Sequence, residues 1–589
     1  MAQFNPKYPE KYNLTDWLPI SADELKRRDW DYVDVILVSG DAYIDHPSFG
    51  AAVIGRLIES MGLRIAILPQ PNWRDDLRDF KKLGKPRLFF GVTAGCMDSM
   101  VNHYTANKRL RSDDAYTPGG SHGFRPDYAS LVYTKILKQL YPDVPVLLGG
   151  VEASMRRFSH YDYWSDSIKP SIIAESGADM LIYGMGELPL TQLVNKLLSG
   201  TPFHLLTDIP QTSFIIKGPF KPLDNDIQIP SHAECEKSKF KYAEAFRMIE
   251  QESVKWESNR LIQQQPEGML VVNPSFPPME TNDIDKVHSL PFTRLPHPRY
   301  FKKDAIPAWE MIKFSINTHR GCFGGCSFCT ISAHQGKFVV SRSEQSILDE
   351  INKVSKLPGF AGHLSDLGGP SANMFGMKGF DIEQCKKCKR ISCIYPSICK
   401  NLNMDHKPMI NLYRIVSSLS CIKRLTIGSG LRYDMFIGFS PKDDERFSLT
   451  AYFRKVVANH VSGRLKVAPE HTHPEILKMM RKPSFDGFLK LHSAFEKECK
   501  KNGKNYQLVP YFISAHPGCK TEHMKALSRE ARNLNIKLEQ VQTFTPTPMT
   551  LSTTMYYTGI NPYDGKEVFV AKSIAQRREQ HECFFWHKK

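Results

Sequence analysis

Short apolar runs alternate with amphipathic stretches through the first part of the chain. Residues 32–38 and 64–68 are nearly continuous apolar runs, which is typical of strands buried on both faces of a sheet. Between them, residues 49–61 carry apolar side chains at four-residue spacing and are followed by Gly62, as expected of an amphipathic helix. This order of strand, helix and strand predicts a βαβ unit of a parallel sheet.

The same alternation continues toward residue 215. Apolar runs at 88–92, 144–148 and 180–183 predict three further strands, each followed by a glycine-rich or polar turn. Ligands of such sheets bind at loops that follow the carboxyl ends of the strands. The sequence therefore predicts an N-terminal Rossmann-like α/β domain, built on an open parallel sheet, over residues 1–215.

The pattern changes after this domain. Residues 242–265 form a polar stretch with helical character, and residues 273–278 and 295–298 are rich in proline. We interpret residues 216–300 as a bridging segment that leads to a second domain.

The second domain is expected over residues 301–560. Residues 313–317 resemble a strand that runs directly toward Cys322, and residues 343–354 have the apolar stripe of a helix. Further strand and helix patterns alternate behind them, which predicts a β/α barrel. Residues 561–589 are expected to form a C-terminal tail.

Composition and charge narrow the choice of partners only a little. The chain has 589 residues, enough for two or three domains, with 41% hydrophobic and 24% charged residues, as in ordinary globular proteins. The formal net charge of +16 is compatible with RNA, with an anionic substrate or with solubility alone. No apolar run could span a bilayer and no apolar signal segment is visible, so we expect a cytoplasmic protein without a membrane partner.

Three closely spaced cysteines are the main chemical signal. Cys322, Cys326 and Cys329 follow the predicted strand on a glycine-bearing loop. Iron-sulfur clusters are usually held by four thiolates, so a compact trio would leave one iron open to another ligand. The alternative is a zinc site completed by His319 or His334, since zinc prefers four ligands.

The trio resembles the CxxxCxΦC signature of radical S-adenosylmethionine (SAM) enzymes, with Phe328 as the aromatic residue. The resemblance implies a 4Fe-4S cluster on the three cysteines and a partial (β/α)6 barrel around it. It also implies that SAM binds the fourth iron and is cleaved reductively to a 5′-deoxyadenosyl radical. The cofactor-binding positions that it implies are Phe328, Gly368, Gly369, Ser429 and Arg432.

A second cysteine group follows the Gly368-Gly369 pair. Cys385, Cys388, Cys393 and Cys399 lie within an insertion that we place at residues 370–415. Four soft ligands so close together favour a metal centre in a cytoplasmic protein. An auxiliary iron-sulfur cluster, a structural zinc ion and free thiols all remain open.

Together with the loop at residues 41–50, both cysteine groups resemble the YgiQ family of radical SAM proteins over nearly the whole chain. The resemblance implies a radical SAM enzyme with an unidentified substrate and an electron donor such as flavodoxin or ferredoxin. The alternatives are a methyl or methylthio transferase acting on RNA or protein, and a non-catalytic, zinc-bearing protein that binds nucleic acid.

The N-terminal domain resembles the cobalamin-binding type of domain that precedes many radical SAM barrels. The cobalamin ligand motif of those domains is Asp-x-His-x-x-Gly. In this chain Asp45 and His46 are adjacent, and Gly50 stands one place late. This departure argues against bound cobalamin.

Overall fold

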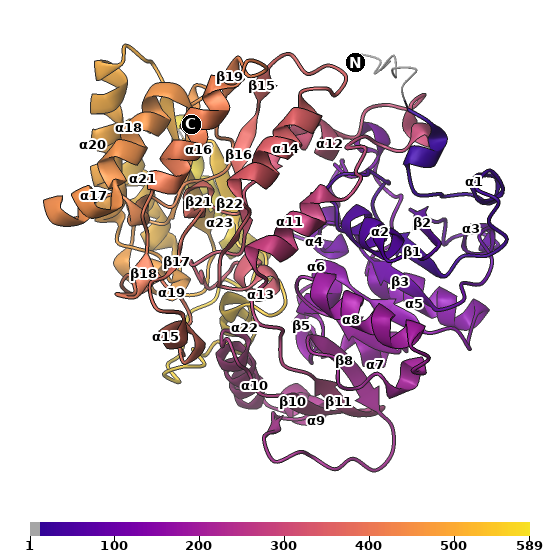
Figure 1. Ribbon diagram of the computed structural model, residues 1–589. Coiled ribbons are helices and arrows are strands. Elements are labelled where there is room, and N and C mark those ends of the chain that lie inside the picture. Colours follow the sequence, from indigo (N-terminus) through magenta and orange to yellow (C-terminus); the bar gives the residue numbers. More distant parts are fainter. Residues whose placement is uncertain (1–11, 537, 589) are drawn as a thin grey trace. The chain divides into compact units, whose positions relative to one another are not determined.

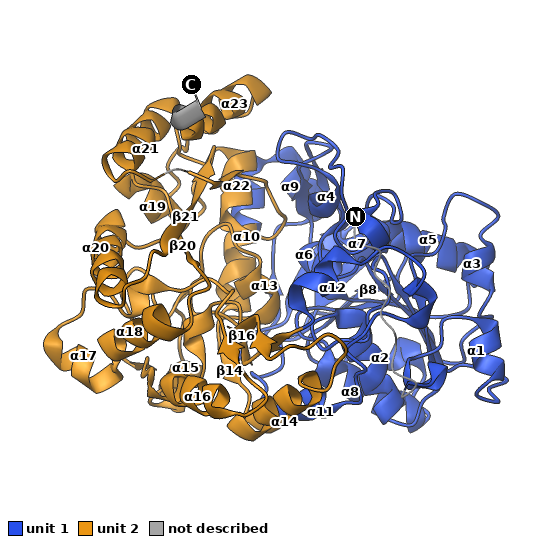
Figure 2. Cartoon of the chain, turned by 90° about the horizontal axis from the view of Figure 1, so that it is seen from above, with its two compact units in different colours: residues 1–245, 257–279, 285–313 blue, residues 246–256, 280–284, 314–589 orange. Residues whose placement is uncertain are grey.

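The computed structural model describes residues 12–536 and 538–588 (Figure 1). They form two compact units, which are coloured separately in Figure 2. Unit 1 comprises the described residues up to 245 together with 257–279 and 285–313. Unit 2 comprises residues 246–256 and 280–284 and the described residues from 314 onward.

Unit 1 is built on a mixed sheet of nine strands. The strands are β1 (Val35–Ser39), β2 (Ile65–Pro69), β3 (Phe89–Thr93), β4 (Val146–Leu148), β7 (Met180–Ile182), β8 (Thr212–Ile216), β9 (Ile227–Gln228), β10 (Leu261–Gln265) and β11 (Gly268–Val272). Their order is β2-β1-β3-β4-β7-β8-β11-β10-β9. The first five are parallel, and Val35 of β1 stands in register between Ile65 and Phe89. The predicted parallel sheet is confirmed for this part.

Helices pack against the parallel strands, and α2 confirms the helix that the apolar stripe at residues 49–61 predicts. Helix α2 (Gly50–Ser60) packs against β1 and β2 and lies beside α8 (Glu187–Leu198). Helix α5 (Ala129–Leu140) packs against β3 and β4 and lies beside α7 (Ile172–Ser176). The strand order changes direction between β1 and β3. The loops that follow the carboxyl ends of these strands meet at this edge of the sheet.

The structure differs from the prediction of a bridging segment at 216–300. Helix α10 (Lys239–Ser253) ends early, and residues 261–272 form an antiparallel hairpin that adds β10 and β11 to the sheet beside β8. The glutamines of β10 gave this strand a polar, helix-like appearance in the sequence. Gln263 and Gln265 are buried because their amide oxygens accept the N–H groups of Ser159 and Ser171, both at 3.0 Å.

Unit 2 contains a partial (β/α)6 barrel, as predicted. Its six strand positions are occupied by β12 (Ser315–Asn317), β15 (His363–Leu364) together with β16 (Asp366–Gly368), β19 (Arg424–Leu425), β20 (Arg464–Glu470), β21 (Gln507–Ser514) and β22 (Gln540–Thr543). The pairs β12–β16, β15–β19, β20–β21 and β21–β22 are parallel, and a parallel bridge between Leu431 and Val467 continues the row. The helices between the strands are α14 (Glu344–Val354), α16 (Lys407–Ser418), α18 (Leu449–Asn459), α20 (Phe485–Lys501) and α21 (Thr521–Asn533).

Part of the predicted C-terminal tail belongs to the barrel. Helix α23 (Ile574–Glu582) carries Arg577, which donates to the Phe544 carbonyl at 2.6 Å, and Gln580, which donates to the Cys519 carbonyl at 2.7 Å. Both side chains are buried, so α23 covers the last strands instead of extending away from them. No described helix combines the length and the apolar character that crossing a membrane requires.

Candidate active site

The three cysteines predicted to bind a cluster lie on a tight loop after β12, the cysteine loop, residues 321–330. A short antiparallel ribbon of β13 (His319–Arg320) and β14 (Val340–Ser341) closes its base. Gly321 has φ +83°, and a Cβ atom there would lie 2.3 Å from the Phe338 carbonyl oxygen. The Cys329 N–H donates to the Cys326 carbonyl at 3.1 Å. The loop thus stands at the carboxyl end of the first barrel strand, where active sites of barrels lie.

Donors from the chain surround two of the three sulfurs. The Gly324 N–H donates to Cys322 Sγ at 3.4 Å, and the Ser371 hydroxyl lies 3.7 Å from the same sulfur. Arg432 Nη1 donates to Cys326 Sγ at 3.4 Å. Such N–H···S contacts stabilise thiolate ligands of iron-sulfur clusters. The trio and its surroundings therefore fit a thiolate-held cluster.

Arg432, a predicted SAM contact, lies against the cysteine loop. Its Nε and Nη2 donate to the Asp434 carboxylate at 2.9 and 2.6 Å, and a Cβ atom at Gly324 would lie 2.6 Å from Nη1. Asn373 exchanges two hydrogen bonds with the Arg432 backbone, at 2.8 and 3.0 Å. Burial acts to raise the pKa of Asp434, but the Arg432 guanidinium lowers it overall.

The other predicted SAM-contact positions gather around β16. The Asp366 carboxylate accepts the Ser429 hydroxyl and also the Gly428 N–H at 2.9 Å, which ties the loop after β19 to β16. A Cβ atom at Gly368 would lie 3.1 Å from Ser429 Oγ, and one at Gly369 would lie 2.6 Å from the His319 ring. A side chain at Gly369 would therefore displace the His319 ring, and Gly368 packs tightly against Ser429.

Phe328 anchors the cysteine loop to the last barrel strands. Its ring meets His516 edge-on at a centroid distance of 6.1 Å. The hydroxyl of Ser552 lies 2.7 Å from His516 Nε2 and 2.8 Å from the hydroxyl of Ser327. Burial lowers the pKa of His516 to about 4, so the imidazole is neutral. The structure gives Phe328 a packing role within the loop.

A buried ion pair at the mouth of the barrel was missed by sequence reasoning. Glu470 ends β20 with φ +68°, and its Oε1 lies 3.7 Å from Lys482 Nζ. Both residues are buried, and burial raises the pKa of Glu470. A non-glycine residue with left-handed backbone geometry at the end of a barrel strand is typical of functional sites. The only sequence signal of Glu470 was its place at the end of a strand.

The four cysteines of the insertion lie close together in unit 2. Cys385 is on the short helix α15 (Ile382–Lys386), and the Cys388 N–H donates to the Cys385 carbonyl at 3.1 Å. The Cys399 N–H donates to the Cys393 carbonyl at 2.8 Å. Within the described part of the chain, no three His, Cys, Asp or Glu side chains are arranged as ligands of one metal ion. A cubane cluster bonds each thiolate to a different iron, so its ligands need not converge on one point.

At the carboxyl edge of the unit 1 sheet, the loop at residues 41–50 forms an ion pair with an arginine of the same unit. Asp45 Oδ1 accepts Arg56 Nε at 3.0 Å, and Asp45 Oδ2 accepts the Thr293 N–H at 2.8 Å. His46 Nδ1 accepts the Ser48 N–H at 3.0 Å. Asp45 is thereby paired with Arg56 and hydrogen-bonded to the backbone of Thr293.

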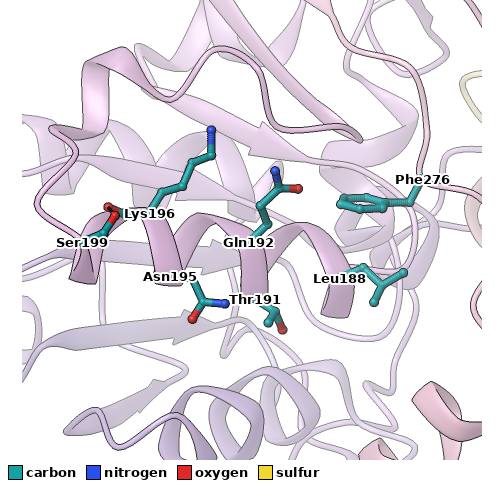
Figure 3. A pocket seen from close by; sticks show the side chains of 7 residues that line it. All are labelled: Leu188, Thr191, Gln192, Asn195, Lys196, Ser199 and Phe276. Carbon is teal, nitrogen blue, oxygen red and sulfur yellow. Dashed lines mark hydrogen bonds between the residues drawn. The ribbon is translucent and has the colours of Figure 1, made fainter.

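A shallow pocket of about 390 Å³ lies along α8 in unit 1 (Figure 3). It is lined by Leu188, Thr191, Gln192, Asn195, Lys196, Ser199 and Phe276. Lys196 pairs with Asp208, and the other polar groups are amides and hydroxyls. The pocket contains none of the predicted site residues.

Comparison with known families identifies the class of the chain. Residues 17–315 match the family described as Radical SAM N-terminal, and residues 539–588 match a domain of unknown function. A UPF0313 protein of Bacteroides thetaiotaomicron is 55% identical, with 98% of this chain and 95% of that protein covered. The UPF0313 protein YgiQ of Escherichia coli is 42% identical, with 97% and 84% covered.

The chain is thus an enzyme of the radical SAM class. Within that class it belongs to the UPF0313 family, which includes YgiQ. Among solved structures, it resembles the radical SAM methyltransferase TsrM of Kitasatospora setae with cobalamin and a 4Fe-4S cluster bound. The TM-score is 0.48 at 15% identity, with 93% of this chain and 81% of TsrM covered. The cobalamin-dependent radical enzyme OxsB also gives a TM-score of 0.48, at 10% identity, with 91% and 56% covered.

Proposed function

We propose that this protein cleaves SAM reductively at a 4Fe-4S cluster bound by Cys322, Cys326 and Cys329, and so starts radical chemistry on a substrate. The observation that carries the proposal is the cysteine loop. It places three thiols at the carboxyl end of the first barrel strand, with Arg432 donating to one of the sulfurs. When bound, the cluster would supply the electron that breaks a carbon–sulfur bond of SAM.

The residues of the chain have distinct roles in this proposal. Cys322, Cys326 and Cys329 would hold the cluster, and one iron would remain available to the amino and carboxylate groups of SAM. Arg432 orients Cys326 and partly balances the negative charge of the thiolates, and Asp434 and Asn373 keep Arg432 in place. Gly368 and Gly369 let β16 pack closely against Ser429 and the His319 ring, beside the cysteine loop. A one-electron carrier of the flavodoxin or ferredoxin class would reduce the cluster.

Anaerobic reconstitution tests the proposal. Wild-type protein that contains the cluster, reduced with dithionite, should convert SAM to 5′-deoxyadenosine and methionine, measured by liquid chromatography. Cys326→Ser should lose the product to background, whereas the exposed Cys421→Ser should match the wild type. A wild-type protein that contains iron and sulfide but never forms 5′-deoxyadenosine would refute the proposal.

We infer further that the loop at residues 41–50 has a structural role and does not bind cobalamin. The buried pair of Asp45 and Arg56 supports this inference. Incubation with hydroxocobalamin followed by gel filtration should leave the protein without the vitamin's absorption. Stoichiometric, tightly retained cobalamin would contradict the inference.

A further inference from the structure

The insertion that carries the second cysteine group packs directly on the cysteine loop. The Phe323 carbonyl accepts the Cys393 N–H at 3.1 Å and the Ser392 hydroxyl at 2.8 Å. Gly325 has φ +59°, and a Cβ atom there would lie 3.0 Å from Ser392 Cβ. The two groups of thiols are therefore neighbours within unit 2, joined through one carbonyl group.

Nitrogen donors point at the sulfurs of the second group. The Arg390 N–H donates to Cys388 Sγ at 3.4 Å, and Asn401 Nδ2 donates to Cys385 Sγ at 3.3 Å. Lys337 Nζ lies 3.7 Å from Cys388 Sγ. Donors of this kind orient thiolate ligands and tune a metal centre. Three donors thus contact two sulfurs, an arrangement that suits thiolate ligands of a metal better than neutral thiols.

A second, independent observation supports a metal centre here: Lys337 is a buried cation beside these thiols. The residue is 3% exposed. Its ammonium donates to the Arg390 carbonyl at 2.6 Å and lies 4.9 Å from the centre of the Phe338 ring, and both of these partners are neutral. Among the described residues, the polar partners of this ammonium are the Arg390 carbonyl and Cys388 Sγ, and no carboxylate is among them. A buried ammonium needs a nearby negative charge, which thiolates bound to a metal would provide.

The spacing distinguishes between the two kinds of metal centre. Zinc sites built from four cysteines usually contain two CxxC pairs. Here Cys385 and Cys388 form such a pair, but Cys393 and Cys399 are separated by five residues. Iron-sulfur clusters accept more varied spacings, including pairs separated by four residues. This pattern therefore favours a cluster.

We propose that Cys385, Cys388, Cys393 and Cys399 bind a second iron-sulfur cluster, whose negative charge Lys337 balances. This site goes beyond the proposed SAM cleavage and does not depend on it. Lys337 lies in the segment that connects the cysteine loop to β14. The second cluster would therefore interact, through Lys337, with the segment next to the ligands of the first cluster.

Removing the first cluster tests for the second. In a variant with Cys322, Cys326 and Cys329 all changed to Ala, the anaerobically reconstituted protein should keep roughly half of the wild-type iron and sulfide, as expected if both centres are of the 4Fe-4S type. Dithionite reduction should leave an electron paramagnetic resonance signal. Adding Cys388→Ala to this variant should abolish the iron and the signal, whereas adding Cys421→Ala should not.

A triple variant that is folded by circular dichroism but binds no iron, or that binds one equivalent of zinc instead, would overturn the proposal. Lys337→Met in this background should lower iron occupancy or shift the reduction potential of the remaining cluster, and Lys337→Arg should restore it. Lys378→Met, at an exposed lysine of the same insertion, is the matched control. If the triple variant retains iron but the wild type never cleaves SAM, only the proposed SAM cleavage fails.

Discussion

Two loops follow the first parallel strand of their respective units and differ in what their polar groups do. The loop after β1, residues 40–50, and the cysteine loop both contain a glycine whose added Cβ would lie 2.3 Å from a carbonyl oxygen. In the first loop, Asp45 is paired with Arg56, while Asp41 lies 2.9 Å from Arg125. In the second, all three cysteines are free thiols, and donors from the chain contact two of the three sulfurs.

The difference shows that position at the carboxyl edge of parallel strands is not enough to make a reactive site. Buried arginines of the same unit pair with the carboxylates of the first loop, so the negative charge of these carboxylates is already balanced within the protein. The thiols of the second loop are partly compensated by Arg432, and a metal cluster can bind them. This contrast is the reason why the proposed function places the chemistry in the second loop and gives the first a structural role.

The largest expected effect comes from breaking the pair in the first loop. Arg56→Ala would leave the fully buried Asp45 carboxylate without its cation, and losing one partner of a buried pair costs about 3–5 kcal/mol. Urea unfolding, followed by a probe in unit 1, should show this loss in the free energy of unfolding. Arg78→Ala, which removes a solvent-exposed pair with Asp76, should cost no more than about 1 kcal/mol. If both variants lowered the free energy of unfolding equally, the result would contradict a structural role for the first loop.

A pH titration examines how the cysteine loop is anchored. His516 is buried with a pKa of about 4, whereas in the unfolded chain its pKa is about 6.5. The unfolded chain therefore takes up a proton between these pH values that the folded chain does not. Stability is lost as the pH falls from 6.5 toward 4, by on the order of 3 kcal/mol for one such group. His516→Gln should reduce the slope of unfolding free energy against pH by about one proton in this window. An unchanged slope would contradict neutral burial of His516.

A smaller effect is expected from Arg432. Arg432→Gln removes the charge beside Cys326 and the bidentate contact with Asp434, and loss of such a supporting contact typically weakens a metal centre by about 10- to 100-fold. The rate of cluster loss to a chelator should rise accordingly. Arg424→Gln, at an exposed arginine of β19, should leave the rate unchanged. If the two variants lose the cluster at the same rate, Arg432 does not support the cysteine loop.

The sequence predicted the elements whose signal is local. The five parallel strands of unit 1, the strand before Cys322 and helix α14 follow from apolar periodicity alone. The hairpin of β10 and β11 did not, because its buried glutamines are satisfied by the distant Ser159 and Ser171. Local pattern cannot reveal a polar side chain whose partner lies about 100 positions away.

In the candidate site, too, the sequence predicted only the residues whose signal is local. The cysteines were found because their spacing is itself the signal. Asp434, Asn373 and the Glu470–Lys482 pair carry no motif, and only the fold brings them to the cysteine loop or to the mouth of the barrel. Arg432 was predicted as a contact of SAM, and the structure adds its contacts with Cys326 and Asp434, which the sequence did not indicate.

The central claim is that the cysteine loop binds a cluster with one iron open to SAM. Electron-nuclear double resonance of the reduced protein, with SAM isotopically labelled in its amino nitrogen and its carboxylate, tests this claim most directly. A variant in which Cys385, Cys388, Cys393 and Cys399 are changed to Ala isolates the first centre. The account predicts strong coupling of both labelled groups to the cluster, absent in Cys326→Ser. A reduced cluster on the cysteine loop that shows no coupling to either group would contradict it.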